Sequence, residues 1–138
     1  MTKDIKLAGF NYTKILVEKE KEFSGELKIS PNINIKNIEK HNSENSKNNF
    51  LKVEFKFGVE YTNLGKIDLE GVMFLIVDSK IQKEVLDSWK NKKLEGNINL
   101  LILNIIMQKA SLKALELEDE MGLPPHVQLP RLQLNKQE

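Results

Sequence analysis

The sequence predicts an α+β fold in which a four-stranded antiparallel sheet, arranged as a meander, is followed by two helices. The segment 51–61 is apolar at every second position, which is typical of a strand with one buried and one wet face. Other alternating segments flank it and are joined by short or polar connections. After residue 78 the apolar residues recur at helical spacing. This order of elements predicts one domain spanning residues 1–138.

The first two strands have the weaker patterns. A short strand is expected over Tyr12–Glu18, and a second over residues 27–35, where aliphatic and polar residues alternate. Pro31 interrupts that alternation. Proline cannot donate a hydrogen bond to a strand ladder, so this strand is expected at a sheet edge or with a bulge.

The third and fourth strands are separated by clear turn residues. Before them, the all-polar segment 41–49 predicts a mobile loop. The turn at residues 62–65 contains Asn63 and Gly65, which tolerate positive φ. The fourth strand, 66–77, first alternates and then becomes apolar on both faces, so its far end is expected to be covered on both sides.

Two helices are expected next. Ser79 and Gln82 form the pattern of a capping box, and the helix that they start runs to about Lys92. A longer helix follows Gly96, from about residue 98 to residue 121, and Gly122 ends it.

The long helix carries two apolar stripes. The stripe expected to face the sheet comprises Leu103, Ile106, Met107, Ala110, Ala114, Leu117 and Met121. One sheet covers only one face of a helix, so a second stripe requires another cover, such as another subunit. We therefore expect a homo-oligomer, a dimer or a tetramer, whose interface contains Leu101, Ile102, Ile105 and Leu112. The proline-rich residues 123–138 are expected to form an extended C-terminal strap.

Composition argues against several classes of function. The net charge is +1 and Arg131 is the single arginine, which does not favour nucleic-acid binding. The absence of cysteine excludes thiol chemistry and cysteine-ligated zinc. The N-terminus lacks the apolar region of a secretory signal, and the apolar stretch 98–107 is about half of a membrane span. We expect a cytoplasmic protein without membrane insertion.

The chain shows no pattern of catalytic residues. His41 is expected to be solvated in the polar loop, and His126 to have a structural role in the strap. The acidic run of Glu116, Glu118, Asp119 and Glu120 is expected on a wet helix face, because such carboxylates do not converge on one metal ion. We therefore expect no enzyme activity, no metal and no cofactor.

Several short strings resemble the SecB family of export chaperones. Residues 12–14 (YTK) resemble the start of the first strand in that family, and residues 29–35 (ISPNINI) resemble the second strand. The Asn63–Gly65 turn falls where the family turns between strands three and four, and residues 122–130 (GLPPHVQLP) resemble its segment after the long helix. The composition, rich in Lys, Ile, Asn and Glu, is similar to that of archaeal SecB-like proteins.

The resemblance implies an ATP-independent chaperone that holds unfolded clients in apolar grooves. It implies client contacts at Ile29, Ile33, Ile35, Leu123, Val127 and Leu129, although strand alternation predicts a plain core position for the same isoleucines. Ile15 and Lys19 stand where the family has acidic residues that bind the SecA motor, which argues against a SecA partnership. The alternative is a structural or adaptor subunit for one dedicated partner, such as an antitoxin.

Overall fold

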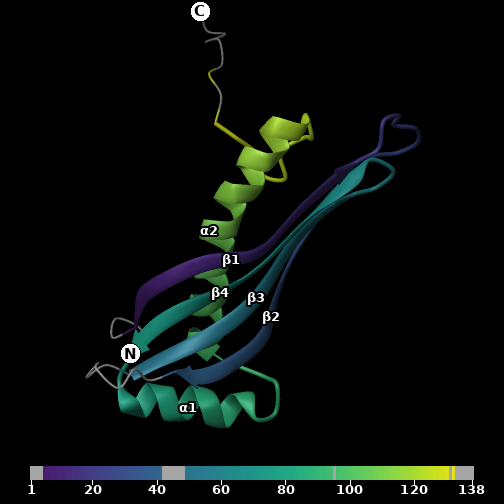
Figure 1. The fold of residues 1–138 in the computed structure, drawn as a ribbon. Helices are drawn as coiled ribbons and strands as arrows, with labels where there is room; N and C mark the ends of the chain where they lie inside the picture. Colours follow the sequence, from purple (N-terminus) through teal and green to yellow (C-terminus); the bar gives the residue numbers. More distant parts are fainter. Residues whose placement is uncertain (1–4, 42–48, 95, 131, 133–138) are drawn as a thin grey trace, which may run out of the picture.

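The computed structural model describes residues 5–41, 49–94, 96–130 and 132. The elements are β1 (Lys6–Lys19), β2 (Ile29–His41), β3 (Asn49–Tyr61), β4 (Gly65–Val77), α1 (Ser79–Trp89) and α2 (Gly96–Met121). The predicted α+β fold, an antiparallel sheet followed by two helices, is confirmed. In Figure 1, α2 passes behind the sheet, and α1 lies at its lower end beside β2 and β3.

The strand order β1-β4-β3-β2 differs from the expected meander. Only β2, β3 and β4 follow one another as neighbours, while β1 pairs with β4, as in a Greek key. The connection 20–28 therefore crosses from one sheet edge to the other around the β3–β4 turn. Backbone hydrogen bonds hold it there, from Glu20 N to Leu64 O (2.7 Å) and from Thr62 N to Lys28 O (3.0 Å).

Both edge strands contain irregularities that obscured them in the sequence. The pairing of β1 with β4 shifts register after Leu7 and after Tyr12, so the alternation breaks, and β1 extends well beyond the predicted 12–18. The pairing of β2 with β3 shifts after Ile35. The prediction from Pro31 is confirmed, because β2 is an edge strand and is also bulged.

The two central strands form the floor of the core. Every odd position of β3 from residue 51 to residue 61 is buried, as the alternation predicts. On the other face of β4, Val72, Phe74 and Ile76 are only half-buried among the described residues, which do not provide the full cover that was expected on both sides of this end. His41 was expected in a solvated loop. It ends β2 instead, with its ring 5.0 Å from that of Phe74.

The helix ends are set by local hydrogen bonds. The N-cap of α1 is Asp78, whose carboxylate accepts from Ile81 N at 2.7 Å. The predicted Ser79 capping box is therefore wrong, and the Gln82 side chain instead donates to Phe50 O at 2.9 Å. Gly122, with φ 67°, follows α2 as predicted, because glycine adopts this conformation without strain.

The buried stripe of α2 comprises Ile102, Ile106, Ala110, Ala114, Leu117 and Glu118. Most of these residues are four positions apart, slightly more than the 3.6 residues of one turn, so the stripe winds slowly around the helix. This matches the oblique path of α2 across the sheet in Figure 1. Met107 and Met121 are consequently exposed rather than core, and Leu103 is half-buried. Ile102, expected at a subunit interface, is fully buried inside the chain.

Within the described part of the chain, α2 is the one helix long and apolar enough to cross a membrane by length and composition. The stretch 98–107 is too short for a span, and the helix meets the criteria only over its greater length. Such a helix is weak evidence for a membrane span, because the core helix of a soluble protein meets the same criteria. Of the relevant 18-residue window, 22% is buried, so the described residues leave part of the apolar surface of α2 uncovered.

Candidate functional site

An open groove runs between the edge strand β2 and α2. It consists of two adjoining pockets of about 260 and 270 Å³, which share Ile33. The first pocket is lined by Pro31, Asn32, Ile33, Phe57, Met107, Ser111, His126 and Val127. The second is lined by Ile33, Asn34, Ile35, Trp89, Lys92, Lys93, Leu94, Asn99 and Leu103. The groove thus follows Pro31, Ile33 and Ile35, which lie on the core-facing side of β2.

Three of the six expected client residues line this groove. Ile33, Ile35 and Val127 lie in it, and both isoleucines are half-buried and pack on the core. Ile29 is half-buried outside the two pockets, and Leu129 is exposed further along the strap. Leu123 is only 5% exposed and belongs to the core, so its assignment to a client surface is wrong. It is buried because the turn at Gly122 directs it back under the helix end.

The opposite wall of the groove was not recognised in the sequence. Met107, 49% exposed, and Leu103 come from α2, and Trp89 comes from the end of α1. Helical periodicity places both α2 residues in the core stripe, because it does not separate the centre of a buried face from its margin. The oblique crossing of α2 places them at the margin that faces β2.

The two pockets differ in charge. The first is lined by uncharged and mainly apolar side chains besides His126, whereas Lys92 and Lys93 are among the residues that line the second. Lys92 Nζ lies 5.4 Å from the centre of the Trp89 ring, and Trp89 Nε1 donates to Asn37 Oδ1 at 3.2 Å. The groove therefore combines an apolar floor with a basic end, which suits an apolar segment that carries an acidic residue.

The remaining expected interface residues lie on the other flank of α2, towards β1. Leu101 and Ile105 are half-buried, and Leu112 is 68% exposed. Nearby, Tyr12 Oη donates to Lys109 O at 3.4 Å, and Ile15 of β1 is also exposed. Of the four predicted interface residues, three thus form an apolar flank, while Ile102 does not reach the surface.

A buried polar cluster joins the end of β3, α2 and the strap. Tyr61 Oη donates to Glu118 Oε2, and His126 Nδ1 lies 2.9 Å from the same oxygen. His126 Nε2 lies 3.1 Å from Ser111 Oγ. The side chains of Glu118 and His126 are each 2% exposed, and Phe57 packs edge-on against the imidazole. The expectation of a wet acidic face is therefore wrong for Glu118, which is buried with two hydrogen-bond partners.

The direction of these hydrogen bonds follows from the groups. An ionised carboxylate only accepts, so Nδ1 of His126 carries the proton that faces Glu118. In the neutral ring Nε2 is then free to accept from the Ser111 hydroxyl. Burial, the hydrogen bond to Glu118 and the negative charge of Glu118 together hold the pKa of Tyr61 well above its usual range. Tyr61 thus remains a proton donor to the carboxylate.

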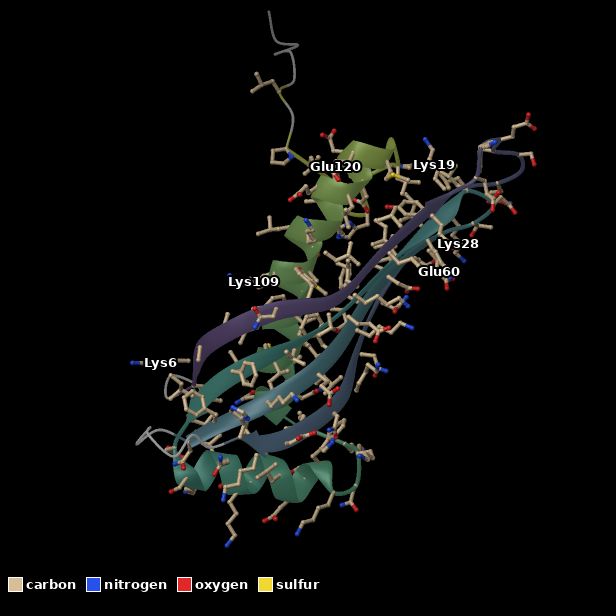
Figure 2. The ribbon with its side chains drawn as sticks, in the orientation of Figure 1. Lys6, Lys19, Lys28, Glu60, Lys109 and Glu120 are labelled. Atoms are coloured by element: carbon tan, nitrogen blue, oxygen red, sulfur yellow. The ribbon has the colours of Figure 1, made fainter. Side chains whose placement is uncertain are left out.

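The turn that leads from α2 into the strap is held at one more point. Figure 2 shows Lys19, at the end of β1, beside the C-terminal end of α2, where its Nζ donates to Gly122 O at 3.3 Å. Within residues 5–41, 49–94, 96–130 and 132, no group of three or more acidic, histidine or cysteine side chains could hold a metal ion.

No protein-family model matches this sequence, and no curated protein matches it either.

Proposed function

We propose that this chain is an ATP-independent holding chaperone of the SecB type that binds apolar segments of non-native proteins. The site is the groove between β2 and α2. The observation that carries the proposal is that groove: it is open along its length, and the exposed surface of its first pocket is mainly apolar, contributed by Pro31, Ile33, Phe57, Met107 and Val127. Unfolded clients share apolar side chains and extended backbone, and these are the features that such a groove selects.

The magnitude of the binding suits reversible holding. Burial of roughly 400 Å² of apolar surface contributes on the order of 10 kcal/mol at about 25 cal/mol per Å². Ordering of the client and loss of its free motion offset much of this, which leaves about micromolar affinity for each segment. Such binding needs no nucleotide or cofactor, and it fits a cytoplasmic protein.

A homo-oligomer would strengthen holding without any new contact. The exposed flank of α2 that contains Leu101, Ile105 and Leu112 is the proposed interface. It faces β1, whereas the groove lies on the β2 side, so assembly through the flank leaves each groove accessible. Several grooves on one particle then bind different segments of the same client, and the combined affinity exceeds that of any one groove.

The experiment measures binding of a short, fluorescently labelled apolar peptide, which occupies one groove and removes avidity from the result. Met107→Ser should raise the Kd about tenfold, because it removes roughly 1.4 kcal/mol of apolar contact. Leu112→Ser is the matched control. Both residues are exposed on α2, but Leu112 lies on the other flank of the helix. The Kd of the peptide for the Leu112→Ser variant should therefore match that for the wild type.

The same proteins are then assayed for suppression of aggregation of several unrelated clients, without ATP. Protection by the wild type at stoichiometric amounts, reduced by Met107→Ser, supports holding. If the wild type protects none of the clients and binds no apolar peptide, the holding function is refuted. Tight binding of one folded partner in that case would indicate an adaptor subunit.

A further inference from the structure

We propose that Ser111 is an activated nucleophile that accepts an acyl group from carboxylic esters with a small apolar acyl chain. The site comprises Ser111, His126 and Glu118 and opens into the first pocket of the groove. This activity is independent of the holding function, because it requires a covalent bond to one hydroxyl rather than an apolar surface.

The geometry has the order of groups used by serine hydrolases: nucleophile, base and orienting carboxylate. Ser111 and Glu118 are seven residues apart on α2, or about two turns, so they share one face of the helix. The turn at Gly122 sends the chain back along that face, which places His126 between them. Its Nε2 lies 3.1 Å from Ser111 Oγ and its Nδ1 lies 2.9 Å from Glu118 Oε2.

Burial makes this arrangement rigid. Glu118 is held by Tyr61 as well as by His126, and Phe57 packs against the imidazole. Tyr61 and Glu118 are therefore positioning residues, which fix the ring and its tautomer without touching the acyl group. Ser111 itself is half-buried and lines the first pocket, so an ester that occupies this pocket would lie against its side chain.

The adjoining pocket sets the class of substrate. Ser111 and His126 both line it, and the other lining side chains are mainly apolar: Pro31, Ile33, Phe57, Met107 and Val127. Its volume of about 260 Å³ accommodates a short acyl chain. A charged or strongly polar acyl group would lose its hydration there without a compensating partner.

The reaction is an acyl transfer followed by hydrolysis. Ser111 Oγ forms a bond to the ester carbonyl carbon while His126 Nε2 takes the hydroxyl proton. The bond between that carbon and the alkoxy oxygen breaks, and the leaving oxygen takes the proton from His126 and departs as the alcohol. Water then releases the carboxylic acid and restores the Ser111 hydroxyl.

The second step is expected to be slow. The apolar lining offers few donors to the negative charge that develops on the acyl oxygen, and the loss of one such donor slows hydrolases by about 10²–10³. The same lack of donors slows the first step too, but an activated ester such as a nitrophenyl ester has a good leaving group and speeds only that first step. With such an ester, acyl-Ser111 should accumulate to about one equivalent of protein before turnover becomes visible.

The experiment treats the full chain with p-nitrophenyl butyrate. It measures the burst of nitrophenolate and locates the butyryl adduct by peptide mass spectrometry. We expect a stoichiometric burst with the adduct on Ser111. Ser111→Ala should remove both, whereas Ser88→Ala, which changes an exposed serine of α1, should leave both unchanged. His126→Gln should slow acylation by about 10²-fold, and His41→Gln should not slow it.

The position of the butyryl adduct in the wild type tests whether Ser111 is the nucleophile, even if the His126→Gln variant fails to fold. Adducts confined to lysine side chains, or a burst that survives in a folded Ser111→Ala variant, would overturn the proposal. In that case the cluster serves only to hold the strap. The peptide-binding assay above is read separately, so failure of acylation leaves the holding function intact and failure of holding leaves acylation intact.

Discussion

The imidazole of His126 lies 2.9 Å from the carboxylate of Glu118, eight residues earlier in the chain. This contact fastens the segment after α2 back onto α2. It also gives the buried carboxylate a second donor besides Tyr61, which removes much of the cost of burying a charge. Because His126 itself and the next residue, Val127, line the first pocket, the same contact fixes the position of one end of the groove.

The Tyr61–Glu118 hydrogen bond should contribute measurably to stability. Tyr61→Phe leaves the buried carboxylate with one donor fewer, so the free energy of unfolding should fall by about 1–3 kcal/mol in urea titration. The control is Tyr12→Phe, which removes a long hydrogen bond at an exposed site. This substitution should change the free energy of unfolding by about 0.5 kcal/mol or less. Equal effects of the two substitutions would contradict a special role of the buried bond.

The raised pKa of Tyr61 adds a pH dependence. Its pKa in the unfolded chain is near 10.0, and in the folded protein it is higher. Between these two values the unfolded chain has lost the proton and the folded protein has kept it, so stability from this group is complete below pH 10 and falls as the pH rises further. The difference in the free energy of unfolding between the wild type and Tyr61→Phe should therefore become smaller in urea titrations above pH 10. A constant difference would exclude this linkage.

Ile33 and Ile35 should affect the groove more than the fold. Both are half-buried, so the double change to Ser should cost roughly 1 kcal/mol at each site rather than the loss typical of a full core position. Peptide affinity should fall strongly while the assembly state stays unchanged. A collapsed melting curve would show that the two residues act mainly as core, leaving Val127 and Met107 as the groove residues to test.

Leu112 should test the proposed assembly. The wild type should sediment as a dimer or tetramer at micromolar concentration, and Leu112→Lys should shift it towards the monomer, because a charge at an apolar interface lacks a partner. The substitution should leave the monomer folded, since the side chain is 68% exposed. A wild type that is a stable monomer would refute the proposed interface.

Gly71 should be irreplaceable in the sheet. A Cβ there would lie 2.3 Å from Asn11 O and 2.7 Å from Phe55 Cζ, so Gly71→Ala should destabilise the fold by about 1–3 kcal/mol or more. Gly9→Ala is the matched control, because it also lies in the β1–β4 pair but its Cβ would meet Phe74 at an ordinary 3.5 Å. Thermal melting should separate the two variants clearly.

The sequence by itself determined the features that depend on near neighbours along the chain. The alternation over residues 51–61 identified the buried face of β3, because successive strand side chains point to opposite sides. Asn63 has a positive φ in the predicted turn, and Gly122 ends α2 as predicted, because both conformations are set by a few adjacent residues. Pro31 marked an edge strand for the same reason.

Only the tertiary structure decided which elements meet and at what angle. The pairing of β1 with β4 joins segments more than 45 residues apart, and no local pattern distinguishes it from pairing with β2. The rotation of α2 on the sheet buried Ile102 and Glu118 and exposed Met107, although helical periodicity alone treats these positions as interchangeable margins of a stripe. His126 meets Ser111 and Glu118 because the chain reverses at Gly122 onto that particular face. Burial and hydrogen bonding across such contacts are properties of the packed surfaces, so they appear only once the helix has been placed against the sheet.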